Sequence, residues 1–156
     1  MTKQEFMAMS LPYEIYAELL DYRCDFVGKQ YDKITAFKQW SKCGDLWSID
    51  TISGAKSSLA RVKPIIHPLS DLTKEIEHNG EKFVPIRMLK NTHGIEYLKK
   101  YLREQDNPNI LGKHFNPYEL KFGALSKLIK LHFDVASLIE KGKAIDVNSL
   151  EINPYK

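Results

Sequence analysis

The sequence has few cysteines and no long apolar run. Cys24 and Cys43 are its two cysteines, and neither has a histidine beside it or the flanks of a metal knuckle. Two cysteines do not make a disulfide framework, so we expect two reduced thiols, as in a reducing cytosol. No apolar segment approaches the roughly 18 residues that a membrane-spanning helix needs, and the first residues lack the apolar core of a signal peptide. These absences predict a cytoplasmic protein with no membrane partner.

Catalytic motifs are also missing. Residues 53–58, SGAKSS, partly match a phosphate-binding loop, but the glycine that should precede Lys56 is absent and Pro64 follows where that loop needs a helix. We interpret the segment as a turn between strands. No serine lies in a nucleophile elbow. His132 and Asp134 are two residues apart and would not face each other on a helix, so a His-Asp dyad is not expected.

Histidines do not fall at metal-binding spacing. The five of them are never close enough in sequence to form a ligand pair on one helix: His67, His78, His93, His114 and His132. We therefore expect no catalytic residue, no metal and no cofactor. An unrecognised hydrolase stays open as an alternative, because a missing motif does not exclude a new active site.

What the chain does contain is the composition of a folded protein. Its 156 residues are 43% hydrophobic and 28% charged, which is ordinary for a globular protein, and the length suits one domain over residues 1–156. The net charge is +3, but ten basic and four acidic residues give the stretch from Lys82 to Lys130 a local charge of +6. This asymmetry predicts an acidic partner for the second half, either nucleic acid or protein.

The first residues predict a short helix. Thr2 and Glu5 form a capping box, and the helix should end near Ser10, before Pro12. Residues 12–21 fit either a second helix or an ordered approach to a strand.

Extended segments follow in the N-terminal half. Strand-like alternation or proline content marks three of them: 22–26, 47–52 and 59–69. Pro64 and Pro68 in the last segment favour an edge strand.

Helical patterns dominate the C-terminal half. Ser70 is a good N-cap for a helix that stops at Asn79-Gly80, with an Asn-Gly hairpin as the rival interpretation. Two further helices are expected, from Leu89 to Leu102 and, after the N-cap Asn116, from Pro117 to Lys141. The tail 144–156 should be extended with a frayed end.

These elements predict an α+β fold. A small antiparallel sheet from the N-terminal half should pack with three or four helices, mostly C-terminal. The side chains expected in the core are Trp47, Ile49, Leu98, Leu102, Leu128, Leu131 and Phe133.

Basic side chains beside tyrosines form the one candidate site. Lys99, Lys100 and Arg103 lie within about one helical turn, with Tyr97 and Tyr101 beside them. More positive charge comes from Lys113, Lys121, Lys127 and Lys130. Such a surface suits RNA, whose bases stack on aromatics and whose phosphates pair with cations, or an acidic protein. Spacing alone favours a solvated helix face with half-buried tyrosines slightly more.

Three blocks of sequence resemble a family of small phage and prophage proteins of unknown function. They are residues 1–13, MTKQEFMAMSLPY; residues 62–86, which begin VKPIIHPLSDL; and the tail blocks 131–135, LHFDV, and 138–148, LIEKGKAIDVN. Together they cover 54 of the 156 residues, about a third of the chain, and the family has no catalytic motif to transfer. The chain departs from the family between Glu14 and Ala60, and again from Lys99 to Lys130, where a more acidic stretch is expected.

The resemblance implies a function. Small phage proteins of this kind include inhibitors of bacterial immunity, and the chain looks like the anti-CRISPR inhibitors of type VI-B RNA-guided ribonucleases. It implies a non-enzymatic inhibitor that contacts the effector or its guide RNA through the basic second half. We expect a monomer or weak dimer in the host cytoplasm. The alternative is a phage accessory or structural protein that binds another phage protein and no nucleic acid.

Overall fold

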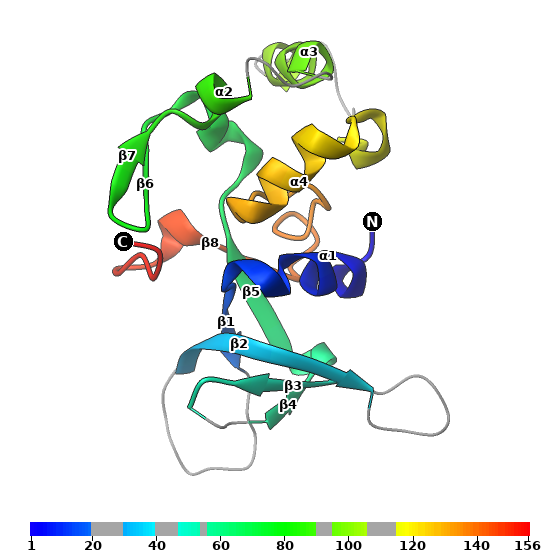
Figure 1. Ribbon diagram of the computed structural model, residues 1–156, viewed down its shortest axis with the longest axis vertical. Helices are drawn as coiled ribbons and strands as arrows, with labels where there is room; N and C mark the ends of the chain where they lie inside the picture. The colour runs from blue at the N-terminus through cyan, green and yellow to red at the C-terminus, as the bar shows by residue number, and fades with distance from the viewer. Residues whose placement is uncertain (20–29, 40–46, 54–55, 90–94, 106–114) are drawn as a thin grey trace.

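Six strands form the main sheet of this α+β protein (Figure 1). The structure is a computed structural model, and it describes residues 1–19, 30–39, 47–53, 56–89, 95–105 and 115–156. Their order is β4-β3-β2-β1-β5-β8. The bounds are β1 Tyr16–Leu19, β2 Gln30–Gln39, β3 Trp47–Thr51, β4 Lys56–Ser58, β5 Val62–Ile66 and β8 Ile145–Asp146. Neighbouring strands are antiparallel except β5 and β8, which run parallel. The predicted α+β class is confirmed, and β8 makes the sheet mixed.

Helices and a separate hairpin complete the described chain. The α-helices are α1 Lys3–Ser10, α2 Pro85–Met88, α3 Ile95–Gln105 and α4 Phe122–Lys130. Short 3₁₀ segments are η1 Leu11–Tyr13, η2 Leu59–Arg61, η3 Leu69–Thr73, η4 Pro117–Glu119 and η5 Val147–Ser149, and the hairpin pairs β6 Ile76–His78 with β7 Glu81–Phe83. Figure 1 places α3 and the strands β2–β4 at opposite ends of the molecule, with α1 and α4 between them.

The capping box of α1 is confirmed. The Thr2 hydroxyl accepts a hydrogen bond from the Glu5 amide at 3.1 Å, and the Glu5 carboxylate accepts one from the Thr2 amide at 2.7 Å. The helix buries Phe6 and Met7 and packs on α4, so a local sequence signal fixes one wall of the core.

The core lies between α1, the central strands, α3 and α4. Of the predicted members, Leu98, Leu128, Leu131 and Phe133 are buried, and Leu102 is half-buried against them. The side chains of Trp47 and Ile49 lie outside the described residues. The prediction is confirmed wherever the structure describes it, because apolar residues at helical spacing find the common interior.

The helix expected from Ser70 to Asn79 is wrong, and the rival hairpin is the structure. Ser70 lies inside the 3₁₀ segment η3, whose N-cap is Pro68, and β6 and β7 are joined by Asn79 and Gly80. Both turn residues have left-handed backbones, with φ of 54° and 78°, which is the requirement of a two-residue hairpin turn. Ile76 and His78 are buried while Glu77 is less so, so the period is that of a strand.

The helix expected from Pro117 to Lys141 is also wrong. Asn116 does cap, accepting from the Tyr118 amide at 3.1 Å, but η4 is a single turn and α4 ends at Lys130. His132 has a φ of 56°, which ends the helix, and Phe133 then forms a parallel bridge with His67, the residue that follows β5. The amide of His67 donates to the His132 carbonyl at 2.8 Å, and the amide of Asp134 donates to the His67 carbonyl at 2.9 Å. These bonds give backbone groups of a buried segment the partners that they need without a helix.

The tail and β5 depart from expectation together. Because β8 pairs with β5, the proline-containing strand is not an edge strand. Pro64 is tolerated since the pairing with β8 involves only Ile65 and Ile66. The tail is not frayed, because Tyr155 near its end is only 2% exposed.

The remaining segment predictions divide between described and undescribed residues. Within the predicted range 12–21, the described residues 12–19 run from the end of η1 into β1, so the approach to a strand is the structure and the α-helix is not; β3 matches the predicted strand 47–52. The predicted strand 22–26 and both cysteines lie outside the described residues.

Candidate functional site

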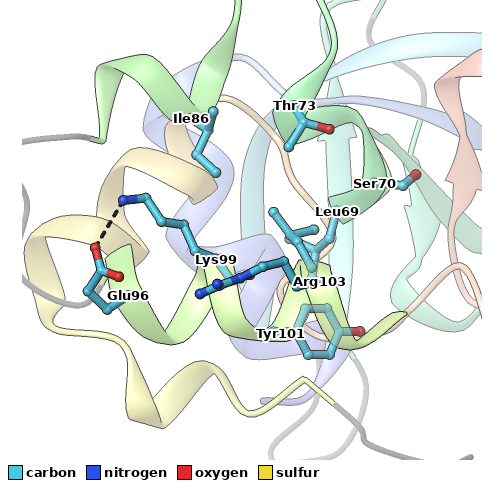
Figure 2. Close-up of a pocket in the computed structure, with 9 residues that line it drawn as sticks. Leu69, Ser70, Thr73, Ile86, Glu96, Lys99, Tyr101 and Arg103 are labelled. Atoms are coloured by element: carbon cyan, nitrogen blue, oxygen red, sulfur yellow. Dashed lines mark hydrogen bonds and ion pairs between the residues drawn. The ribbon is translucent and has the colours of Figure 1, made fainter. Parts of the chain in front are cut away.

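Helix α3 is amphipathic and presents cations to solvent. Ile95 and Leu98 are buried, whereas Lys100 and Arg103 are exposed. The Lys99 ammonium lies 2.9 Å from the Glu96 carboxylate, and the Arg103 Nε donates to the Lys99 carbonyl at 3.2 Å. Figure 2 shows Lys99 and Arg103 on the side of α3 that faces η3 and α2. The basic side chains of α3 therefore reach the protein surface, although Lys99 is already paired with Glu96.

The two tyrosines of α3 face Phe115. The Tyr97 ring lies 5.8 Å from Phe115, and its hydroxyl accepts a hydrogen bond from the Asn116 amide at 2.9 Å. The Tyr101 ring meets Phe115 edge-on at 5.1 Å, and burial raises the pKa of its hydroxyl, with Glu140 adding to the effect. Both rings are half-buried and join α3 to the chain before η4, which leaves little ring surface for stacking with a base.

Helix α2 contacts both helices that carry the cations: Ile86 lines a groove with α3, and Met88 is hydrogen-bonded to Lys127 of α4. Lys127 and Lys130 are exposed on α4, and Lys121 is exposed at its N-cap. The Lys127 ammonium donates to the Met88 carbonyl of α2 at 3.3 Å. Lys113 lies outside the described residues. We call the following set the basic face: Arg87 of α2, Lys99, Lys100 and Arg103 of α3, and Lys127 and Lys130 of α4.

A groove opens between η3, α2 and α3. Its volume is about 570 Å³. Figure 2 shows its walls, which are Leu69, Ser70 and Thr73 from η3, Ile86 from α2, and Glu96, Lys99, Tyr101, Leu102 and Arg103 from α3. The groove combines aliphatic side chains with the cations of Lys99 and Arg103. Such a groove can take an apolar side chain whose neighbours are acidic.

Two exposed aromatics near the start of α4 carry no signal that the sequence analysis used. Tyr118 is 70% exposed and Phe122 is 76% exposed, with the exposed Lys121 between them. The pattern held a signal, because neither aromatic falls on the stripe through Leu120 and Ala124 that packs inward. Tyr118 and Phe122 thus offer open aromatic faces on η4 and α4, unlike the predicted Tyr97 and Tyr101.

A second cluster unites three histidines that are far apart in sequence. His67 follows β5, His78 ends β6 and His132 follows α4. The ring centroids of His67 and His78 are 6.2 Å apart, and those of His78 and His132 are 5.4 Å apart. All three are buried, and no hydrogen bond of normal geometry reaches either nitrogen of His67 or His132, or the Nδ1 of His78. Because the three histidines belong to different elements, no spacing along the sequence indicates that they lie together.

Burial keeps these imidazoles neutral. It lowers the pKa of His67 to about 4, helped by the charge of His78 and opposed by Asp71. It lowers the pKa of His132 to about 3, and the nearby backbone of Tyr13 offsets only part of this. Burial also lowers the pKa of His78. A buried imidazole nitrogen without a hydrogen bond costs folding free energy, and such groups are uncommon in folded proteins. Three neighbouring imidazoles with such nitrogens are therefore a notable feature of this fold.

His67 also borders a polar cleft of about 580 Å³, together with Ser70 and Asp71. The Asp71 carboxylate accepts from Lys74 at 2.8 Å and from Asn148 at 2.6 Å, and lies 3.9 Å from the His67 Nδ1. Because neither His67 nitrogen is hydrogen-bonded, Ser70 is not activated by it as a serine nucleophile would be. Across the described ranges, no group of three or more His, Cys, Asp or Glu residues is placed to hold a metal ion.

Comparison with protein-family models, curated proteins and solved structures finds no match for this chain. The resemblance to small phage proteins therefore stays a prediction. In the part of the chain that the structure describes, no helix has the length and apolar character to cross a bilayer.

Proposed function

We propose that this protein is a non-enzymatic binding protein that docks on an acidic protein surface through its basic face. The observation that carries the proposal is the groove beside that face. It joins the aliphatic side chains of Leu69 and Ile86 to the cations of Lys99 and Arg103. A protein partner can supply both an apolar anchor and flanking carboxylates, whereas a nucleic acid supplies no aliphatic anchor.

The groove and the cations of the basic face have different physical roles. An apolar side chain that fills a groove and loses its water supplies most of the affinity of an interface. Cations around the groove mainly raise the association rate and exclude partners of the wrong charge. We therefore expect the association rate to depend on salt concentration, and the dissociation rate, which the apolar anchor sets, to depend on it little.

The partner class follows from the resemblance and is part of the proposal. A small phage protein of this kind would act in the host cytoplasm as an anti-CRISPR inhibitor, bound to an RNA-guided ribonuclease effector. Contact with the guide RNA is the second candidate, and the open aromatic faces of Tyr118 and Phe122 favour it. Binding to another phage protein is the remaining alternative.

Charge reversal on the basic face tests the proposal. Two double variants are made, Lys99→Glu with Lys100→Glu and Lys127→Glu with Lys130→Glu, and each is checked for an unchanged melting temperature. The matched control, Lys82→Glu with Lys143→Glu, changes two exposed lysines outside the face. Partners are captured from host extract, identified, purified and measured by surface plasmon resonance at low and high salt. We expect the face variants to slow association about tenfold or more at low salt, and the control to leave it unchanged.

Filling the groove separates a protein partner from RNA. Thr73→Trp adds bulk at the exposed groove wall, and Ile52→Trp adds it on an exposed residue at the end of β3. A protein anchored in the groove should dissociate about tenfold or more faster from Thr73→Trp alone. Single-stranded RNA stacked on Tyr118 and Phe122 should instead weaken in Tyr118→Ala and Phe122→Ala. Full binding by folded face variants and by Thr73→Trp would refute the proposed docking surface.

A further inference from the structure

In the tail, residues 150–156, the buried side chain of Tyr155 contacts the body of the protein. Its hydroxyl donates to the Ile65 carbonyl of β5 at 2.6 Å and accepts from the Tyr16 amide of β1 at 3.2 Å. Its own carbonyl accepts from the Asn79 amide in the β6–β7 turn at 2.6 Å. One buried residue therefore joins the tail to two strands of the main sheet and to the hairpin.

The Tyr155 ring covers all three buried histidines. It stacks on His132 with a centroid distance of 4.6 Å and on His78 at 5.2 Å, and it lies 6.0 Å from His67. The histidines come from β5, β6 and the end of α4, so the ring is their common neighbour. Removing Tyr155 would admit water to each of them.

The closed arrangement cannot accommodate protonated histidines. A charged imidazole has two N–H donors and needs two acceptors or water. Both nitrogens of His67, both of His132 and the Nδ1 of His78 have no hydrogen-bond partner, and each side chain is more than nine-tenths buried. A proton on His78 or His132 would leave a buried charge with no acidic partner among the described residues, and a proton on His67 would face only the Asp71 carboxylate at 3.9 Å; burial makes each of these charges unfavourable.

Acidic groups around the cluster are already committed. Asp71 on η3 is 3.9 Å from His67, but its oxygens accept from Lys74 and Asn148. Asp134, two residues after His132, directs its carboxylate to the amides of Leu138 and Ile139.

Beside the tail, Glu77 of β6 is paired with Lys156 at 3.9 Å. Tyr16 of β1 meets the Tyr155 ring edge-on and brings no charge. Within the described surroundings, Asp71 is thus the one acid close to an imidazole, and it serves His67 alone.

We propose that the tail is an acid-released latch: protonation of His67, His78 and His132 detaches Tyr155 and residues 150–156, while the main sheet and α4 stay folded. Release removes Asn153 and Lys156 from the wall of the polar cleft that also contains His67 and Asp71. The protein therefore has a closed form near neutral pH and a form with an open cleft in acid.

The direction of the effect follows from the proton balance. In the closed form the pKa of His67 is about 4 and that of His132 about 3, whereas a solvated imidazole has a pKa of about 6.5. The open form therefore takes up protons as the pH falls below about 6.5. The equilibrium constant for opening should rise by up to about tenfold per pH unit for each histidine that opening frees.

Hydrogen exchange of the full chain tests the latch. Exchange is followed by mass spectrometry between pH 7.5 and pH 4.5 and corrected for the intrinsic pH dependence of amide exchange. Peptides covering 150–156 and the hairpin 76–83 should lose protection steeply below about pH 6.5, while the peptide covering 122–130 keeps it. Simultaneous loss of protection in all three peptides would mean global unfolding and would overturn the proposal.

Variants assign the pH dependence to the cluster. His78→Gln with His132→Gln should flatten the pH dependence of tail opening, and His78→Gln alone should reduce its slope if the double variant does not fold. Tyr155→Phe removes the hydroxyl bonds and keeps the ring, so it should weaken the latch equally at every pH. The matched control, His93→Gln with His114→Gln, removes two histidines outside the described residues and should change nothing. An unchanged slope in folded His78→Gln, or a flattened slope in the control, would refute the latch.

Discussion

At the scale of the residue, Asp134 decides the path of the chain after α4. Its carboxylate accepts from the amides of Leu138 at 2.7 Å and Ile139 at 2.9 Å, and its own amide donates to the His67 carbonyl. Burial raises its pKa, and the hydrogen bonds from Ile139 and Leu138 oppose that rise. The Asp134 carboxylate, which is not expected to form a catalytic dyad with His132, thus serves as a buried cap for the turn that follows it.

We expect Asp134→Asn to destabilise the protein by about 1–3 kcal/mol, because the amide group would direct a donor at a backbone donor in a buried site. The free energy of unfolding in urea at pH 7 measures this. Asp146→Asn is the matched control, since Asp146 also caps an amide, that of Asn148 at 2.8 Å, but at an exposed site. Equal losses in the two variants would show that burial of Asp134 is unimportant.

At the scale of the element, the β6–β7 hairpin depends on two residues with left-handed backbones. Gly80 has a φ of 78° and open space where a Cβ would lie. A side chain there meets backbone strain and no clash.

Gly80→Ala should therefore cost about 1–2 kcal/mol, the strain of a left-handed L-residue. Gly123→Ala is the control, because Gly123 lies in α4 without a positive φ and alanine there should stabilise by up to about 1 kcal/mol. Thermal unfolding of both variants distinguishes them by sign. A neutral Gly80→Ala would show that the turn relaxes easily.

Elements with local signals could be predicted from the sequence, and elements decided by distant contacts could not. The capping box of Thr2 and Glu5 acts within one helical turn, so it was readable. Residues 70–80 satisfy both a helix pattern and a hairpin pattern, and only burial of Ile76 and His78 selects the hairpin. The chain after Lys130 is apolar enough for either structure, and its bonds to His67 select the extended one.

The candidate site follows the same division. The sequence located the basic stretch, because charge is a sum over residues. It could not reveal that Tyr97 and Tyr101 are used in packing on Phe115, or that α2 closes a groove with α3. The histidine cluster needs β5, β6 and the end of α4 in place before it exists. Sites assembled from three segments carry no sequence spacing to detect.

At the scale of the whole molecule, Leu128 on α4 occupies the centre of the core. Its side chain is fully buried, whereas Leu131 at the end of the helix is 9% exposed. We expect Leu128→Ala to cost about 2–5 kcal/mol, because a cavity remains where the side chain was. Leu131→Ala should fall at the lower end of that range. Chemical denaturation measures both, and losses below about half a kcal/mol in both variants would contradict the assigned helix faces.

The parallel pairing of β5 with β8 has a consequence for synthesis. Ile65 of β5 pairs with Ile145 of β8, and the Ile65 carbonyl accepts from the hydroxyl of Tyr155, which lies 90 residues later in the chain. At a translation rate of about 5–20 residues per second, β5 would wait roughly 4–18 s for that partner. During this interval the nascent chain carries an unpaired strand edge, which other chains can join. Assembly of this protein is therefore most exposed to aggregation while it is being made, and a chaperone that shields β5 should raise its yield.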